Sequence, residues 1–381
     1  MERATRELLD TIAKSTSTPI EEARALPALA YVSEEVFQLE VEHIFRKEWL
    51  YVGREEQVAG PGDYLAFDLV GEPIVIVRDE AGTLHALSNV CRHRYMQLVE
   101  GQGHADKFVC PYHGWTYQLD GALAGAPHMT ESRIFERRGC RLPEFRLETW
   151  LGSIFVNLDP QAEPFAPRHE AAFERLAPYR LDQMRIVAEI DEVWDGNWKL
   201  GFENGTETYH VSVLHANTVA SWNPTSAGSS ESGGEVGNWL LTDLDLDQIP
   251  EDSASFVGLI RRGGASLPER DRGLFIGYNI YPNLIVDINP GHCLWLSWLP
   301  IDATHVHVHG RVSVFPEEIE AGGEAFQSEQ QEWMNAVNAE DAEATWRLQK
   351  AMASHHSVAG PLSVREENML RFQRYLARRL T

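Results

Sequence analysis

The sequence predicts an α+β protein of at least two domains, on three observations. The chain has 381 residues, enough to bury a sizeable core and to form two or three domains. Residues 51–158 consist of short strand-like runs separated by Gly, Pro and Asp turns, as in a small all-β module. The remainder combines strand-like runs between 273 and 316 with helical patterns at 326–353 and from about 363.

Four further segments complete the expected elements. Residues 32–49 carry apolar side chains near helical spacing, which predicts one amphipathic helix. Residues 168–182 have a helix-like pattern. Residues 196–215 are polar at the start and then half-apolar, which predicts a helix in their second part. Residues 223–238 are rich in Ser and Gly and predict a loop.

The net charge and the cysteine content indicate which binding partners are disfavoured and which cellular compartment is expected. The net charge of −24 disfavours binding to nucleic acid or to an anionic membrane, because both would repel the chain. No run approaches the roughly 20 apolar residues of a membrane span, and the mixed-charge N-terminus lacks the apolar core of a secretory signal. Four cysteines are too few for a disulfide framework, so we expect a cytoplasmic protein whose thiols can bind metal.

Two Cys/His pairs lie inside the β module. The pattern is Cys91-x-His93, sixteen residues, then Cys110-x2-His113. Zinc accepts two thiolates and two imidazoles, but zinc sites usually take both thiols from one loop and the imidazoles from a helix. Here each loop supplies one sulfur and one nitrogen, which suits a two-iron cluster with two Cys on one iron and two His on the other.

With "CRHR" at 91–94 and "CPYHGW" at 110–115, this region resembles the Rieske [2Fe–2S] family. The resemblance implies a Rieske domain at 49–160, with the cluster held by Cys91, His93, Cys110 and His113. A pure electron carrier would end near residue 160, yet more than 200 residues follow.

The stretch "ENGTETYHVSVLH" carries the second constellation, with Glu207 three residues before His210 and His215 five residues after it. Five residues on an ideal helix turn the direction by about 140°, so two imidazoles at one ion need a π-bulge or a helix end between them. Two His and one carboxylate on one face of Fe(II) leave positions where O2 binds beside a substrate.

This stretch resembles the mononuclear-iron motif of Rieske non-haem iron oxygenases, in particular the large (α) subunits of aromatic-ring-hydroxylating dioxygenases of benzoate type. The resemblance implies a catalytic domain at 161–381, with an antiparallel sheet flanked by helices in a helix-grip arrangement. The N-terminal helical segment 1–48 is expected to pack on that domain. Implied cofactors are the [2Fe–2S] cluster and a mononuclear Fe(II) held by His210, His215 and a carboxylate from the C-terminal helix, with O2 as co-substrate.

Two neighbouring residues compete for the carboxylate position, Asp341 and Glu340. At 100° per residue, Asp341 lies about 40° and Glu340 about 60° from Val337, on opposite sides. The apolar face of this helix favours Asp341, and so does the family pattern. Asp341 is therefore the expected ligand, with Glu340 as the alternative.

Glu207 departs from the family pattern, which usually has aspartate at this position. Glutamate there is similar to the oxygenases of quaternary ammonium compounds such as carnitine, betaine and choline. The family also forms rings of three, in which an acidic residue links a cluster histidine of one subunit to an iron-ligating histidine of the next. That resemblance assigns the link to Glu207, between His113 and His210 of neighbouring subunits.

The sequence therefore predicts the terminal oxygenase component of a Rieske system acting on a small organic substrate, in the first place an aromatic (carboxylate) ring. The alternatives are monooxygenation or N-demethylation of a quaternary ammonium compound, and a Rieske electron carrier without enzymatic activity. The chain has no GxGxxG fingerprint and no further cysteine quartet, so electrons must come from NAD(P)H through a separate reductase. A ferredoxin and a β subunit are left open, and His305, His307 and His309 are interpreted as an ordinary strand face.

Overall fold

The computed structural model describes residues 2–220, 222–223, 228–244, 256–264 and 266–381. The chain forms two compact units, one of residues Phe45–Pro167 and one of Met1–Ile44 with Arg168–Thr381. The first unit is all-β and the second combines an antiparallel sheet with helices, which confirms the predicted fold class. Among the described residues, no helix has the length and apolar character needed to cross a membrane.

The smaller unit consists of two antiparallel sheets. Its strands are β1 (Leu50–Arg54), β2 (Asp63–Leu69), β3 (Glu72–Arg78), β4 (Leu84–Ser88), β5 (Gln102–His104), β6 (Phe108–Val109), β7 (Thr116–Tyr117), β8 (Leu123–Gly125), β9 (Glu144–Trp150) and β10 (Ser153–Asn157). Seven of them form one sheet in the order β1-β10-β9-β4-β3-β2-β5, and β6-β7-β8 form a second. The two predicted metal loops join strands of these sheets.

The larger unit is built on one antiparallel sheet in the order β11-β17-β16-β15-β14-β13-β12. Its strands are β11 (Arg185–Trp194), β12 (Gly228–Ser232), β13 (Gly237–Asp243), β14 (Leu274–Ile280), β15 (Leu284–Asn289), β16 (His292–Pro300) and β17 (Val306–Val314). The helices of the chain are α1 (Arg3–Lys14), α2 (Leu29–Val32), α3 (Glu34–Glu40), α4 (Phe165–Arg168), α5 (Glu170–Leu176), α6 (Trp198–Gly205), α7 (Val211–Leu214), α8 (Phe256–Gly264), α9 (Pro316–Met352) and α10 (Glu367–Leu380).

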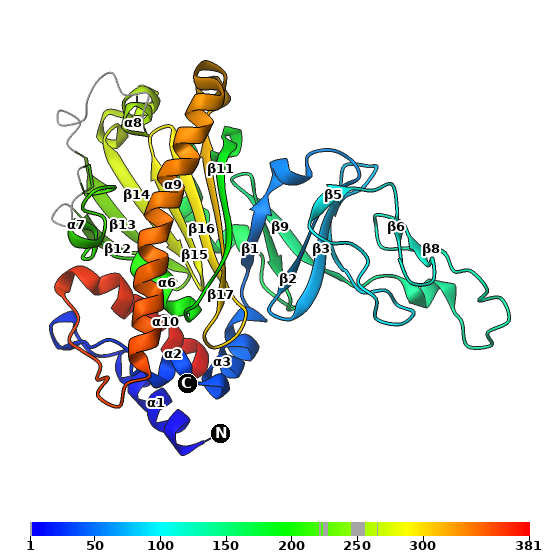
Figure 1. The fold of residues 1–381 in the computed structure, drawn as a ribbon, viewed down its shortest axis with the longest axis horizontal. Coiled ribbons are helices and arrows are strands. Elements are labelled where there is room, and N and C mark those ends of the chain that lie inside the picture. Colours follow the sequence, from blue (N-terminus) through cyan, green and yellow to red (C-terminus); the bar gives the residue numbers. More distant parts are fainter. Residues whose placement is uncertain (1, 221, 224–227, 245–255, 265) are drawn as a thin grey trace. The chain divides into compact units, whose positions relative to one another are not determined.

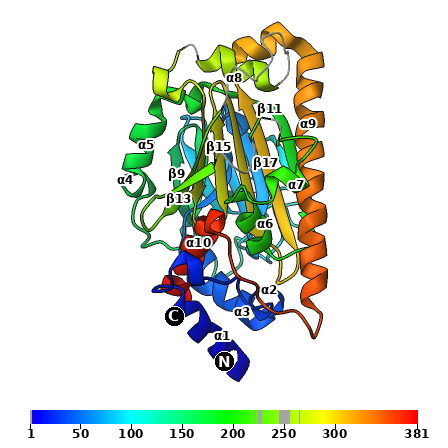
Figure 2. The same ribbon diagram turned by 90° about the vertical axis from the view of Figure 1, so that its left-hand side faces the viewer.

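Helix α9 runs across one face of this sheet, with α6 beside it (Figures 1 and 2). Glycines allow both helices to approach closely. A Cβ at Gly310 of β17 would lie 2.4 Å from Met334 Cε of α9, and one at Gly201 of α6 would lie 2.2 Å from Trp298 Nε1 of β16. Real side chains do not come so close, so Gly201 must stay glycine against the rigid Trp298 ring, whereas at Gly310 the flexible end of Met334 would have to move. The close packing fixes α6, and with it the segment that carries the two predicted iron-binding histidines.

The N-terminal segment is attached to α6 by buried polar contacts. Lys199 Nζ lies 2.6 Å from Glu40 Oε1, with both side chains 1% exposed, and Trp198 Nε1 donates to Glu40 Oε2 at 2.9 Å. The Tyr31 hydroxyl donates to Glu203 Oε2 at 2.8 Å. A buried charge is tolerated only when it is paired, so this network ties α2 and α3 to α6.

Two expected helices differ from the structure. The single helix predicted at 32–49 is shorter in the structure: it begins at Glu34, because the Ser33 side chain accepts a hydrogen bond from Val36 N and caps it, and its α-helical part ends at Glu40. A π-helical turn, Val41–Phe45, follows before the chain enters β1. The long helix predicted from 326 begins ten residues earlier, at Pro316, and has a kink at Gly323 (φ 59°).

Two other expectations were also wrong in part. In residues 196–215 the longer helix is α6, in the first part rather than the second, because Asn197 caps it and its apolar side chains bury against the sheet. In the predicted loop 223–238, residues Gly228–Ser232 pair with β13 as strand β12. Residues 224–227 of that loop lie outside the described part of the chain.

Candidate metal centres

The four predicted cluster ligands lie on two loops of the smaller unit. Cys91 and His93 follow β4, and Cys110 and His113 connect β6 to β7. Both cysteines are buried, at 1% and 3% exposed, whereas His93 is half-buried and His113 is exposed. The two imidazole rings are 4.6 Å apart between centroids. The loops therefore bury both sulfurs, while the His113 ring is exposed and the Nδ1 atom of His93 is closed to solvent.

Both loops repeat the same turn. In the first, Tyr95 N donates to Cys91 O at 3.2 Å, and in the second Gly114 N donates to Cys110 O at 3.0 Å. The donor residue is left-handed in each loop, with φ of 59° at Tyr95 and 72° at Gly114, a conformation that glycine adopts without strain. The next residue accepts a hydrogen bond from the cysteine N–H in each loop, so the two sulfurs are presented in equivalent ways.

Aromatic side chains hold these ligands. Trp115 stacks on the His93 ring at 4.9 Å with an interplanar angle of 7°. The Tyr117 hydroxyl lies 3.3 Å from Cys91 Sγ and accepts a hydrogen bond from Arg92 N at 3.0 Å. Burial raises the pKa of Tyr117, so it stays a neutral donor beside a sulfur ligand. Hydrogen bonds to the sulfurs are a known determinant of cluster potential.

The spacing of the four ligands distinguishes a cluster from a single zinc ion. In the described part of the chain, groups of three His, Cys, Asp or Glu atoms within 4.8 Å of one another occur only at His210–His215–Asp341 and at Asp191–His307–His309. The Cys/His set is more widely spread than one ion requires. Two buried cysteine sulfurs and two neighbouring imidazoles fit a [2Fe–2S] cluster.

The second centre is formed where α6 ends. The short helix α7 begins after His210 and ends before His215, whose backbone (φ −99°, ψ 31°) has already left the helix. The two imidazole centroids are 5.1 Å apart. Helix ends at both histidines thus bring together two rings that a continuous helix would point apart.

Asp341 of α9 completes this group. His215 Nε2 lies 3.1 Å from Asp341 Oδ1. Two ligand atoms about 2.1 Å from one divalent ion and at right angles to each other would lie about 3.0 Å apart. Glu340 lies behind the histidine instead, because His215 Nδ1 is 2.7 Å from Glu340 Oε2, which also accepts a hydrogen bond from Thr218 Oγ1 at 2.7 Å.

Glu207 contacts Nδ1 of His210 in the same way as Glu340 contacts Nδ1 of His215. His210 Nδ1 is 2.6 Å from Glu207 Oε1, and Glu207 Oε2 accepts hydrogen bonds from the backbone N–H groups of Tyr209 and His210. A carboxylate on Nδ1 keeps the proton there and leaves Nε2 as the metal ligand. Both histidines are therefore prepared to bind through Nε2.

Negative charge is concentrated at this centre. Burial by itself would lower the pKa of His215, but Asp341 and Glu340 raise it by hydrogen bonding and charge. Burial and the Asp341 carboxylate raise the pKa of Asp287, on β15, to about 7. Such a field favours a bound cation, and two nitrogens with one carboxylate fit Fe(II).

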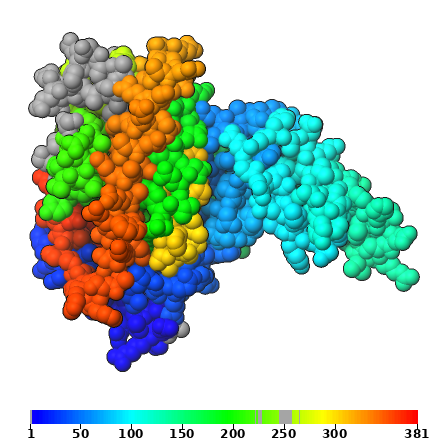
Figure 3. All heavy atoms as spheres, in the orientation of Figure 1, coloured from blue at the N-terminus to red at the C-terminus, as the bar shows by residue number. Residues whose placement is uncertain are grey.

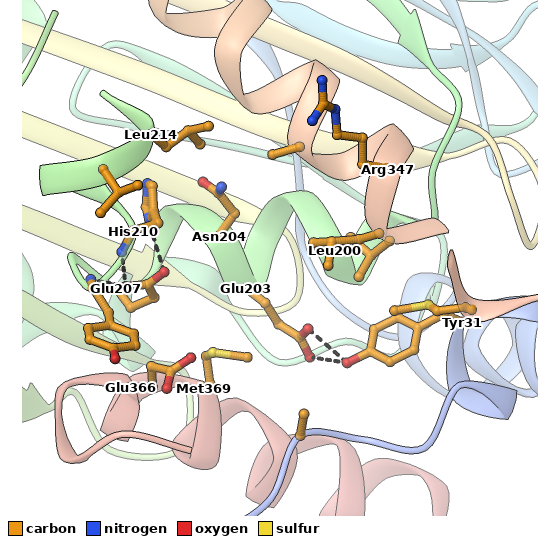
Figure 4. Close-up of a pocket in the computed structure, with 16 residues that line it drawn as sticks. Tyr31, Leu200, Glu203, Asn204, Glu207, His210, Leu214, Arg347, Glu366 and Met369 are labelled. Carbon is orange, nitrogen blue, oxygen red and sulfur yellow. Dashed lines mark hydrogen bonds and ion pairs between the residues drawn. The ribbon is translucent and has the colours of Figure 1, made fainter. Parts of the chain in front are cut away.

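A hollow of about 940 Å³ adjoins the centre on the side of Glu207 and His210 (Figure 4). Its lining is mainly apolar, with three carboxylates, and Arg347 of α9 lies at its edge. Burial raises the pKa of Glu203 to about 7, and burial with the Glu207 charge raises that of Glu366. Figure 3 shows α9, in orange, on the molecular surface beside the green segment that contains α7.

The predicted row of strand histidines faces carboxylates. His305 Nδ1 lies 2.9 Å from Asp302 Oδ2. His307 and His309 both face Asp191 on the neighbouring strand, and Arg311 Nη2 lies 3.8 Å from the same carboxylate. Their ligand atoms are close enough for a metal ion. The contacts with Asp191 agree with the interpretation of this row as a polar strand face, which stays a prediction.

The sequence prediction missed the supporting residues. Thr218, Trp115 and Tyr117 act through other side chains, and no spacing rule indicates them. Asp287 carried a signal, because it is the one charged residue in the buried strand "LIVDIN".

The fold and the two metal-site motifs define a Rieske-type iron oxygenase. Residues 48–146 match the Rieske [2Fe-2S] domain, and residues 179–381 match the ring hydroxylating alpha subunit (catalytic domain). The chain therefore belongs to the family of Rieske non-haem iron oxygenase large subunits, enzymes with a [2Fe–2S] cluster and a mononuclear iron, as the sequence predicted.

Individual relatives differ in substrate. The chain is 38% identical over 193 residues to the glycine betaine monooxygenase oxygenase subunit of Chromohalobacter salexigens, covering 50% of this chain and 43% of that protein. It is 30% identical over 234 residues to the anthranilate 1,2-dioxygenase large subunit of Acinetobacter baylyi, covering 59% and 50%. These matches span about half the length of the relatives or less.

The fold is shared with a solved quaternary ammonium Rieske monooxygenase, described for carnitine oxidation by gut microbiota and inter-subunit electron transfer. The TM-score is 0.83 at 24% identity, covering 97% of this chain and 98% of that one.

Proposed function

We propose that this chain is the oxygenase component of a system that hydroxylates a quaternary ammonium compound with O2. The observation that carries the oxygenase activity is the group of His210, His215 and Asp341, in which a carboxylate holds each histidine by Nδ1. Support for the substrate class comes from the glycine betaine relative at 38% identity, against 30% for the anthranilate enzyme. Glu207, which stands where ring-hydroxylating dioxygenases usually have aspartate, supports the same substrate class. The alternative substrate class of the sequence prediction is thus better supported than the aromatic ring that it placed first.

The proposed roles follow from the geometry. His210, His215 and Asp341 would hold the mononuclear iron, which when bound supplies the site where O2 is activated. Glu207 and Glu340 keep the two imidazoles in the tautomer that ligates through Nε2. In the smaller unit, the two cysteines and the two histidines of the metal loops would hold the cluster that delivers electrons.

The overall reaction balances with two electrons from a partner reductase. An N-methyl group, O2, two electrons and two protons give an N-hydroxymethyl group and water. The N-hydroxymethyl compound then breaks its C–N bond to release formaldehyde, a tertiary amine and a proton. NAD(P)H is the source of the electrons through that separate reductase, with a ferredoxin between them where the reductase needs one.

Electron delivery between subunits is supported by complementary surfaces. The tip of the cluster loops exposes Tyr95 and Tyr112, at 90% and 54%, together with the cations Arg92 and Arg94. The hollow beside Glu207 is apolar with three carboxylates. We propose a homotrimer in which the tip of one subunit enters the hollow of its neighbour. The solved relative is described for inter-subunit electron transfer.

Metal analysis and substrate-triggered turnover test the proposal together. We expect about three irons and two acid-labile sulfides per chain, since the cluster contributes two irons and the second centre one. With the cluster reduced beforehand, glycine betaine or carnitine should trigger O2 uptake and cluster oxidation. Two irons per chain would indicate an electron carrier, and turnover with benzoate or anthranilate alone would restore the aromatic prediction.

A further inference from the structure

Asp287 has one carboxylate oxygen that is buried without a hydrogen-bond partner among the described residues. The residue is half-buried, but its Oδ1 atom is closed to solvent, and within the described part of the chain no donor reaches this atom. Its pKa is raised to about 7 by burial and by Asp341, and no cation of the described residues opposes these effects. Leaving such a group unpaired costs stability.

Asp287 faces the side of the sheet that carries the iron-binding residues. Side chains alternate along a strand, so Asp287 points to the same side as Ile285, two residues earlier. Ile285 contacts α6, because a Cβ at Gly205 would lie 2.5 Å from Ile285 Cδ1. Asp341 lies on α9, which crosses the same face. The charge of Asp341 reaches Asp287 across this space.

Asp287 lies next to an apolar cluster on the neighbouring strands. Gly277 stands opposite Asp287 on β14, and a Cβ at Gly277 would lie 3.2 Å from both Asp287 Oδ1 and Leu240 Cβ. Leu240 belongs to a buried cluster with Leu244, Ile260 and Phe275, against which Trp222 and Trp333 pack. An unpaired carboxylate oxygen next to an apolar cluster that has aromatic rings at its border can attract a quaternary ammonium group, because a carboxylate and ring faces both attract a cation.

We propose that Asp287 is the counter-ion of the cationic head of the substrate. The inference rests on the proposed function and names the residue that selects for charge. A quaternary ammonium group would neutralise Asp287 and lie on the iron side of the sheet, so that the carbons bonded to its nitrogen are presented for hydroxylation. An arene carboxylate would be repelled by the same residue, and a neutral arene would leave its charge unpaired. Asp287 thereby excludes the substrates of the aromatic dioxygenases.

Two probes of the same shape isolate the effect of charge. Glycine betaine and 3,3-dimethylbutanoate differ only in having nitrogen or carbon at the quaternary centre. Calorimetric titration of the iron-loaded trimer without O2 should show that the wild type binds glycine betaine on the order of 10- to 100-fold more tightly. Asp287→Asn, which keeps the shape and removes the charge, should bind the two probes within about 3-fold of each other.

Two controls separate recognition from damage to the fold. Asp243→Asn removes an exposed carboxylate from β13 of the same sheet and should discriminate as the wild type does. The thermal midpoint of Asp287→Asn without ligand should equal or exceed that of the wild type, because an unpaired buried charge is removed. A lowered midpoint with discrimination retained would make Asp287 a structural residue and overturn the inference.

Two failures are distinguishable. If the wild type oxidises quaternary ammonium compounds and Asp287→Asn still prefers glycine betaine by the wild-type ratio, the inference fails and the proposed function stands. Wild-type oxidation of benzoate or anthranilate in place of any cation would overturn both.

Discussion

Replacing Glu207 by glutamine should disconnect electron transfer from the iron site without emptying that site. The carboxylate now accepts on both oxygens, from His210 Nδ1 on one and from two backbone N–H groups on the other. An amide has one acceptor oxygen, so it can serve the ring or the backbone but not both. Glu207→Gln therefore loses the charge on the hydrogen bond to His210 in either orientation.

The magnitude follows from the bond that is lost. Glu207 is 8% exposed, and its 2.6 Å contact with His210 is a short, charge-assisted hydrogen bond. Bonds of this kind contribute about 1.5–3 kcal/mol, which corresponds to roughly 10- to 100-fold in iron affinity or in rate. Excess Fe(II) fills the mononuclear site even when its iron affinity is lowered. The defect that remains at full iron loading should be in the transfer of electrons from the cluster.

Single turnover of the iron-loaded trimer is the decisive assay. The cluster is reduced beforehand, mixed with substrate and O2, and its reoxidation is followed by absorbance. Glu207→Gln should keep the trimer and about three irons per chain while losing at least about 10-fold in the reoxidation rate. Glu207→Asp should lose less, because it keeps the charge. Glu366→Gln removes a carboxylate from the same hollow without touching His210 and serves as the control.

The reasoning is refuted by a wild-type rate of cluster reoxidation in Glu207→Gln. An equal loss in Glu366→Gln would assign the effect to the charge of the hollow and not to the contact with His210.

Three further predictions concern the ligands and the buried acids. Asp341→Asn should empty the mononuclear site and keep the cluster spectrum, whereas Glu340→Gln should lower the Fe(II) affinity by about 10- to 100-fold. Titration with Fe(II) measures both affinities, and a larger loss in Glu340→Gln than in Asp341→Asn would make Glu340 the ligand. His93→Cys or His113→Cys should retain a cluster at a lower reduction potential, because thiolate donates more charge; unchanged potentials in voltammetry would contradict the Rieske ligation. Burial raises the pKa of Glu203 to about 7, so the folded state holds this proton more tightly. As the pH rises from about 4.5 to 7, the wild type should therefore lose up to about 3 kcal/mol of unfolding free energy relative to Glu203→Gln. Chemical denaturation at pH 5 and 7.5 checks this, and the same difference in unfolding free energy between the two proteins at both pH values would refute it.

The metal loops could be predicted because their chemistry is local. Cys91 and His93 are two positions apart, Cys110 and His113 three, and the glycine that the second turn requires stands next to the last ligand. Short-range backbone geometry fixes how such residues are presented, so their spacing alone indicates the kind of metal site.

The choice between Asp341 and Glu340 depended on contacts across the sequence. By helical geometry, Asp341 and Glu340 lie about 40° and about 60° from Val337 on the apolar face, a difference of only about 20°. The structure places Asp341 Oδ1 at 3.1 Å from His215 Nε2 and Glu340 on the opposite nitrogen of the same ring. Asp341 and Glu340 are thus distinguished by which nitrogen of the His215 ring each contacts. His215 lies more than 120 positions earlier in the sequence, so helical spacing alone could not show this.

The sequence by itself therefore determined the class of the protein, the two metal motifs and the alternation of sheet and helix. These depend on residue type and on spacings of a few positions. The tertiary structure decided what acts over distance: the Glu340 carboxylate behind His215, the Asp341 oxygen on the other side of the same ring, and the unpaired oxygen of Asp287. A sequence pattern shows that an acid lies in a buried strand. Whether a partner meets it there depends on how sheet and helices pack, because the absence of a neighbour is a property of the folded chain.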